Sequence, residues 1–146
     1  LDADVVALQE VVGSGPEEDG QAAELGARLG MGWVMDSVRL LRGKSYGNVV
    51  LSRLPIETTQ HCDLSCDKRE PRGCHRVDVD VHGQRLHVFN VHLGTAVFER
   101  RKQAPPLAEF VADRHVRGPK VLLGDFNEWV KGLASKTLGE ILEGVD

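Results

Sequence analysis

Polar side chains that could bind a phosphate and a metal ion stand directly after three apolar segments. Glu10 follows the apolar run 5–8, Asn90 and His92 end the run that begins at 86, and Asp125 and Asn127 follow the run 121–124. Carboxylates and carboxamides supply the oxygen ligands that Mg²⁺ prefers, and an imidazole can donate to a phosphate oxygen. We therefore predict phosphate chemistry at the ends of these segments.

Within each pair the side chains are predicted to share a face. Alternate residues of a strand point the same way, so Asn90 and His92 lie together, as do Asp125 and Asn127 if the strand stays extended. Three simpler interpretations stay open. In the first, Glu10 is only a surface residue. In the second, His92 is a hydrogen-bonded structural histidine, and in the third, 125–127 is a turn with local side-chain hydrogen bonds.

Other catalytic patterns are absent from the sequence. It contains no GxGxxG motif and no P-loop lysine motif, and no serine stands between the glycines of a nucleophile elbow. A covalent mechanism through serine or cysteine therefore has no support.

The elements that must position these residues alternate between strand-like and helix-like patterns. Strands are expected at 4–8, 33–40, 46–52, 76–82, 85–92 and 120–124, and helices at 17–30, 97–115 and 134–142. Pro105 and Pro106 should kink or interrupt the second helix. Since several strands are joined by hairpins, the order favours an α/β (α+β) sandwich of mixed or antiparallel sheets.

The segment 76–82 alternates most regularly. Its odd positions are valines, and its even positions are Arg76, Asp78, Asp80 and His82. Such alternation predicts a strand with one face in water.

Length and composition are those of one globular domain. The 146 residues are 41% hydrophobic and 27% charged, and no apolar run is long enough to span a bilayer. The net charge of −4 argues against a general polyanion binder, so an anionic substrate would need a metal ion or a local basic cluster. Two such clusters occur, 68–76 and 100–102, although each is also explained as a solvated face.

The three cysteines suit reduced thiols in a cytosolic protein. Cys62, Cys66 and Cys74 form an odd set at irregular spacing. A bridge from Cys62 to Cys66 or to Cys74 stays open. A zinc site with His61 and His75 is conceivable, but the CxxxC spacing is a weak signal and no second pair follows.

Four segments occur in an order that is typical of one superfamily. They are DVVALQEV (4–11), YGNVVLSRLPI (46–56), NVHLG (90–94) and LLGDFN (122–127). Together they resemble the endonuclease/exonuclease/phosphatase superfamily, which includes DNase I-like nucleases, inositol polyphosphate 5-phosphatases and sphingomyelinases. The segments 70–73 and 99–103 resemble those of bacterial members. The resemblance implies a four-layer α/β/β/α sandwich of two mixed sheets flanked by helices.

The resemblance also implies a role for each matching residue. Glu10 matches the glutamate that holds a catalytic Mg²⁺ ion, with Mn²⁺ as an alternative. His92 matches the histidine that contacts the scissile phosphate, and Asn90 packs beside it. Asp125 matches the aspartate that orients the attacking water, and Asn127 the asparagine that holds phosphate, water or metal.

Three further residues are weaker candidates for phosphate contact. Asn48 matches an asparagine on the strand beside the site, where a structural role is equally expected. Arg72 and Arg100 come from the two bacterial-type segments. The implied activity is a Mg²⁺-dependent hydrolysis of phosphate esters, with phosphodiesters as the leading class and DNA, a lipid headgroup or a small phosphodiester as substrate.

The chain departs from the family pattern at both ends. Members have an early asparagine upstream of the position of Leu1 and a late Ser-Asp-His segment, and neither is present. We therefore expect 1–146 to be a single partial domain, truncated at both ends, and a non-catalytic fragment is the alternative function. Because the first residue is not Met, a lost signal peptide stays open. Otherwise we expect a cytoplasmic monomer without an obligate protein partner.

Overall fold

The computed structural model describes residues 2–15, 20–128 and 132–142. The elements, in chain order, are β1 (Val5–Val12), α1 (Gln21–Leu29), β2 (Gly32–Leu41), β3 (Lys44–Ser52), β4 (Ile56–Asp63), β5 (Gly73–Val81), β6 (Gln84–His92), α2 (Val97–Val111), β7 (Lys120–Asp125) and α3 (Leu133–Leu142). None of the helices in these ranges has the length and apolar character required to cross a bilayer.

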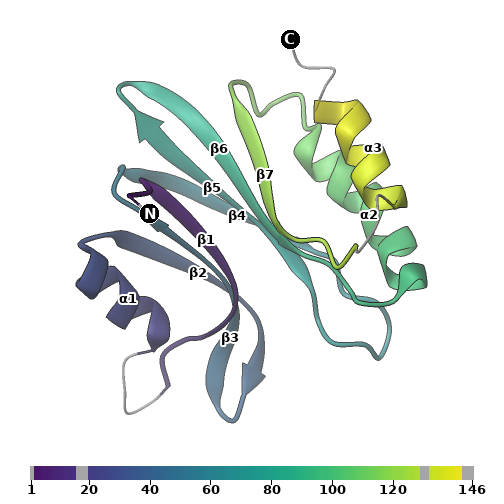
Figure 1. The fold of residues 1–146 in the computed structure, drawn as a ribbon, viewed down its shortest axis with the longest axis horizontal. Coiled ribbons are helices and arrows are strands. Elements are labelled where there is room, and N and C mark those ends of the chain that lie inside the picture. Colours follow the sequence, from purple (N-terminus) through teal and green to yellow (C-terminus); the bar gives the residue numbers. More distant parts are fainter. Residues whose placement is uncertain (1, 16–19, 129–131, 143–146) are drawn as a thin grey trace.

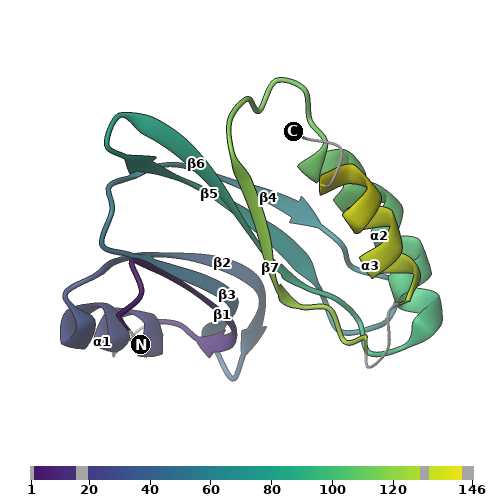
Figure 2. The same cartoon turned by 45° about the horizontal axis from the view of Figure 1, so that its top comes forward.

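Two sheets pack face to face between helices (Figure 1). One sheet has the strand order β1-β3-β2 and the other β4-β5-β6-β7. Figure 2 shows α1 on the outer face of the first sheet and α2 and α3 on the outer face of the second. The predicted four-layer α/β/β/α arrangement is therefore confirmed. Only the second sheet is mixed in the described residues, because β7 runs parallel to β6 while every other pair is antiparallel.

Alternating side chains divide the core into three layers. Val50, Val77, Val79 and Val88 pack between the sheets, and Val49 and Leu51 pack on the other face of β3 with Ala22 of α1. Phe89, Val91 and Leu93 pack with Leu107 and Val111 of α2. Strands β3 and β6 therefore carry apolar residues on both faces.

Strand β4 was not predicted. It pairs on one side only, with β5, and most of its side chains are exposed. An edge strand with little burial has no need for apolar alternation, so the segment lacked the period-2 signal. The β-branched pair Thr58 and Thr59 was the remaining sign of a strand.

The prediction that one face of β5 lies in water is wrong over most of the strand. Arg76 and Asp78 are 7% and 2% exposed. Asp78 accepts from Thr58 Oγ1 at 2.8 Å and lies 2.8 Å from Nδ1 of His87 and 3.1 Å from Nε of Arg76. This face also carries Cys74, which packs under α2, so helices and loops exclude the water. Only the hairpin end, at His82, is exposed as predicted.

Helix α2 continues through Pro105 and Pro106, so of the predicted kink or interruption the interruption is wrong. Gln103, Ala104, Leu107 and Ala108 on either side of the prolines are buried. Gln103 also accepts from the amide of Gly94 at 2.9 Å and donates to the carbonyl of Leu64 at 2.9 Å. Tertiary packing thus outweighs the missing N–H groups, and the helix ends at Val111, four residues before the expected end.

The three cysteines are free thiols, as predicted. Cys62 lies opposite Cys74 in the β4–β5 ladder, and burial raises the pKa of the Cys74 thiol well above its ordinary value. The described residues contain no group of three His, Cys, Asp or Glu side chains that could hold a metal ion, so the zinc alternative has no support there.

Candidate functional site

Strands β6 and β7 bring two of the predicted clusters together. Their parallel register places His92 directly beside Asp125, and Nε2 of His92 lies 3.8 Å from Oδ2 of Asp125. The His92 side chain is 8% exposed, whereas that of Asp125 is 51% exposed. A buried donor and an accessible carboxylate therefore meet at the edge of the sheet.

Gly124 shapes the chain just before Asp125. Its φ is +137°, and a Cβ atom there would lie 1.9 Å from the carbonyl oxygen of Val91. A glycine is required, because any side chain would push β7 away from β6 at the residue that precedes the carboxylate.

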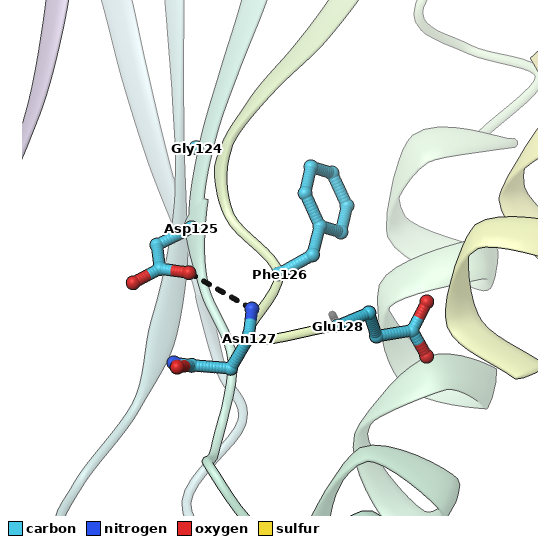
Figure 3. A pocket seen from close by; sticks show the side chains of 5 residues that line it. All are labelled: Gly124, Asp125, Phe126, Asn127 and Glu128. Atoms are coloured by element: carbon cyan, nitrogen blue, oxygen red, sulfur yellow. Dashed lines mark hydrogen bonds between the residues drawn. The ribbon is translucent and has the colours of Figure 1, made fainter. Parts of the chain in front are cut away.

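Asp125 and Asn127 are held by a turn, which was the alternative interpretation of this cluster. Asn127 has a φ of +50°, and its amide N–H donates to Oδ1 of Asp125 at 2.8 Å. Its side-chain Nδ2 donates to the carbonyl of Leu93 at 2.8 Å. Figure 3 shows the Asp125 and Asn127 side chains on one side of the segment and Phe126 and Glu128 on the other. The shared direction is as predicted, although the extended geometry behind that prediction is not kept.

The turn borders an open pocket. Gly124 and the next four residues line a volume of about 490 Å³ (Figure 3). Phe126 packs against the core under α2 and anchors the turn. Behind Phe126 the pocket wall therefore rests on the core, and the wall is polar on the side where Asp125 and Asn127 lie.

Glu10 comes from the other sheet and has an unusual backbone. It lies in a β-bulge between Leu8 and Val11, is exposed, and has a φ of +60°. Such a conformation costs roughly 1 kcal/mol for a residue other than glycine and persists where the surroundings impose it. Glu10 lines a pocket between β1 and α1, and its negative charge also acts on His92 of the second sheet.

Tyr46 lies within the electrostatic reach of the Glu10 carboxylate. The pKa of the Tyr46 phenol is raised first by burial and then by the negative charge of Glu10. The phenol is therefore favoured in its protonated, neutral form.

Asn90 lies between the two sheets and is completely buried. Its Nδ2 donates to the carbonyls of Leu8 and Val49, each at 3.0 Å, and its Oδ1 accepts from Nε2 of Gln9 at 2.7 Å. Asn48 is also buried and donates to the carbonyls of Gly73 and Asn90. We interpret both asparagines as supports of the site, since their amides are engaged within the protein.

Arg72 contacts the edge of the His92 ring that points away from Asp125. Its Nη1 lies 3.5 Å from Nδ1 of His92, and its Nη2 is 3.0 Å from Oε2 of Glu70. The pKa of His92 is lowered chiefly by burial and then by the positive charge of Arg72, while Asp125, Glu10 and Glu70 oppose the shift. His92 is thus favoured as a neutral imidazole.

Arg100 is directed away from this cluster. Its Nη1 donates to the carbonyls of Gly94 and Thr95 at 3.0 and 2.6 Å, and its Nε lies 3.8 Å from Oε1 of Glu128. The guanidinium therefore stabilises the loop after β6, and phosphate contact by Arg100 stays a prediction.

Glu10 fits a magnesium ion as a single-carboxylate ligand. The described residues hold no cluster of three acidic, histidine or cysteine ligands. Mg²⁺ does not need such a cluster, because it keeps several waters and is commonly held by one or two carboxylates together with substrate phosphates. The donor set here therefore suits Mg²⁺ or Mn²⁺ better than zinc.

Comparison with known families agrees with this arrangement. The model of the Endonuclease/Exonuclease/phosphatase family matches residues 1–140, so the chain belongs to that family. Members of this family are phosphoesterases and nucleases.

Individual relatives extend the comparison without fixing a substrate. The uncharacterized protein YbhP of Escherichia coli strain K12 is 41% identical over 87 residues, which are 58% of this chain and 34% of YbhP. A conserved protein of unknown function from Enterococcus faecalis V583 shares the fold with a TM-score of 0.78 at 20% identity, over 95% of this chain and 58% of that chain. The chain thus spans little more than half of such a structure.

Two further solved structures have names that state an activity. A mannosyl-6-phosphatase of Bacteroides thetaiotaomicron has a TM-score of 0.78 at 19% identity, over 95% of this chain and 57% of that chain. The sphingomyelinase C of Streptomyces griseocarneus has a TM-score of 0.67 at 21% identity, over 95% of this chain and 56% of that chain. Identities this low show the fold only.

Sequence reasoning missed three residues that position the site. Gln9, Tyr46 and Glu70 contact Asn90, Glu10 and Arg72 respectively. Each stands within or beside a segment that carried the family resemblance, but only the tertiary structure shows which side chain it contacts.

Proposed function

We propose that the whole protein hydrolyses phosphate esters, with phosphodiesters as the leading class. The observation that carries the proposal is the pair formed by His92 and Asp125, whose Nε2 and Oδ2 atoms lie 3.8 Å apart at an accessible sheet edge. Two atoms at this separation can both hydrogen-bond to one oxygen placed beside them. A water or a phosphate oxygen is the ligand that such a pair suits.

Each residue has a part that its surroundings support. Asp125 would orient the attacking water and accept its proton, and His92 as a neutral donor would stabilise charge that develops on a phosphate oxygen. Asn127 would hold the phosphate or the water. A Mg²⁺ ion at Glu10, when bound, would neutralise charge on the phosphoryl group. Hydrolysis of a phosphate ester needs little beyond this alignment and neutralisation.

The substrate class is narrowed by charge and by the relatives. A net charge of −4 disfavours a nonspecific DNA nuclease, which normally binds through a basic surface. One similar structure is a mannosyl-6-phosphatase and another a sphingomyelinase C. A sugar phosphate and a lipid phosphodiester are therefore the substrates to assay beside an aryl phosphodiester, with DNA as the alternative.

The test is hydrolysis with Mg²⁺, with Mn²⁺ and with EDTA, on the 146-residue chain and on the full open reading frame that encodes it. Glu10→Gln and Asp125→Asn should each lower kcat by about 10²–10³, the usual effect of removing one electrostatic contact. Glu57→Gln is the matched control, since Glu57 is a partly exposed glutamate on β4 that pairs with Arg85. Activity that survives EDTA, or survives both substitutions, would refute the proposal.

A second candidate is a non-catalytic binding or structural role for this chain. The partial coverage of the matched structures is the observation that favours it. Mg²⁺ titration by calorimetry separates the two candidates. Binding that Glu10→Gln abolishes, together with turnover by the 146-residue chain, would exclude the non-catalytic role.

A further inference from the structure

Glu70 has no part in the proposed reaction, yet its carboxylate joins two arginines beside the site. Oε1 accepts from Nη2 of Arg39 at 2.8 Å, and Oε2 pairs with Nη2 of Arg72 at 3.0 Å. The Arg39 and Arg72 side chains are 29% and 7% exposed. The Nε atoms of both are buried without a hydrogen-bond partner in the described structure. Glu70 is therefore the anion that holds both guanidinium groups in place.

One arm of this bridge reaches the imidazole of His92. A guanidinium only donates, so Nδ1 of His92, 3.5 Å from Nη1 of Arg72, must offer a lone pair if the two are to attract. The ring hydrogen then sits on Nε2, which faces Asp125. The other tautomer would set two N–H groups against each other and leave Nε2 unable to donate.

The second arm reaches the other sheet. The Arg39 guanidinium lies over the Tyr46 ring, 4.3 Å from its centroid, and the negative charge of Glu10 acts on the Tyr46 phenol. Arg39 thereby fixes Glu70 from β2, while Arg72 precedes β5 in the second sheet. The position of Arg72 is thus set from both sheets through one carboxylate.

We propose that Glu70 is a positioning residue of this site, which by holding Arg72 fixes His92 in the tautomer that carries its hydrogen on Nε2. The catalytic consequence rests on the proposed hydrolase function. The tautomer itself is a property of the folded chain and is measurable without turnover.

A glutamine at this position cannot replace the bridge. Its carbonyl oxygen accepts from one arginine, and its NH₂ group points N–H bonds at the other. The two cations would then lack their common anion, and repulsion would move Arg72 away from Nδ1 of His92. The imidazole would be free to exchange between its two tautomers.

The experiment is ¹⁵N NMR of the histidine ring nitrogens in the 146-residue chain at neutral pH, with His92→Gln used to assign the His92 signals. The wild type should show an unprotonated Nδ1 and a protonated Nε2. Glu70→Gln should move both nitrogens toward the averaged values of a tautomer mixture. Glu57→Gln, which removes another glutamate–arginine pair, between β4 and β6, should leave them unchanged.

Kinetics give the second readout where hydrolysis is detected. Loss of a residue that orients a catalytic ligand commonly costs about 10–100-fold in activity, so Glu70→Gln should lower kcat by that factor with little change in KM. An unchanged tautomer in Glu70→Gln, or the same change in Glu57→Gln, would overturn the inference whether or not the protein proves to be a hydrolase. Should Glu70→Gln fail to fold, Arg39→Gln removes one arm only and is judged by the same criterion.

Discussion

Replacing Asn90 tests whether the site depends on the polar contacts between the sheets. Asn90→Leu keeps the number and branching of the side-chain heavy atoms but removes two hydrogen bonds of 3.0 Å to carbonyls and one of 2.7 Å from Gln9. Each such bond contributes about 1 kcal/mol, and the carbonyl of the fully buried Val49 would lose a partner at a cost of about 1–2 kcal/mol more. We expect the free energy of unfolding to fall by about 3–5 kcal/mol.

Asn90→Asp is the sharper variant, because its effect should depend on pH. A carboxylate there would face two carbonyl oxygens without water, which raises its pKa above the ordinary value of about 3.9. The unfolded variant then binds fewer protons than the folded one between these two pKa values. The stability of Asn90→Asp relative to the wild type should therefore rise as the pH falls through the raised pKa.

The assay is urea unfolding followed by circular dichroism between pH 5 and 8. Asn127→Leu is the matched control, since Asn127 is only partly buried and its side chain donates one hydrogen bond, to Leu93. With roughly 1 kcal/mol more for a leucine at a φ of +50°, its cost should be about 2 kcal/mol. The reasoning fails if Asn90→Leu costs no more than Asn127→Leu, or if the cost of Asn90→Asp is the same at every pH.

Three further outcomes are expected. Gly124→Ala should lower the free energy of unfolding by about 2–4 kcal/mol in urea, because its Cβ would overlap the Val91 carbonyl at a φ of +137°. Burial lowers the pKa of His75 below its ordinary 6.5, so on acidification the unfolded chain binds a proton before the folded chain does. The free energy of unfolding should therefore fall as the pH drops below about 6.5. His75→Gln should make this decline smaller in thermal unfolding measured from about pH 7 to 5. Arg100→Gln should lower Tm and leave KM unchanged, whereas a raised KM at constant Tm would restore Arg100 as a phosphate contact.

The strands and helices could be predicted where burial imposes a period. β6 alternates between the inter-sheet layer and the layer under α2, so its sequence contained the signal. β4 has one neighbour and few buried side chains, which removed the signal. On β5 a regular period was present but was misinterpreted. Arg76 and Asp78 predicted a water-exposed face, but charged residues that are paired with each other can be buried under a helix layer.

The residues of the candidate site could be predicted from the sequence, but the contacts between them could not. Motif order singled out His92 and Asp125, and the parallel register of β6 and β7 that makes them neighbours is formed across the whole of α2. The contact of Glu70 with Arg39 depends on two distant segments meeting in space, which spacing along the chain does not encode. The backbone of Glu10 could not be predicted either, since a left-handed conformation in a bulge leaves no signal in the hydrophobic pattern.

The division of the site between two sheets explains why its supports are polar. Glu10 belongs to the first sheet and Asp125 to the second, so their separation is set by how the sheets pack. Apolar contacts between sheets are non-directional and tolerate small sliding movements, whereas hydrogen bonds have a defined length and angle. The amides of Gln9, Asn48 and Asn90 cross this interface at the level of the site. A loss of these bonds should therefore reduce catalysis before it unfolds the sandwich, because the valine layer can still hold the sheets together after their alignment is lost.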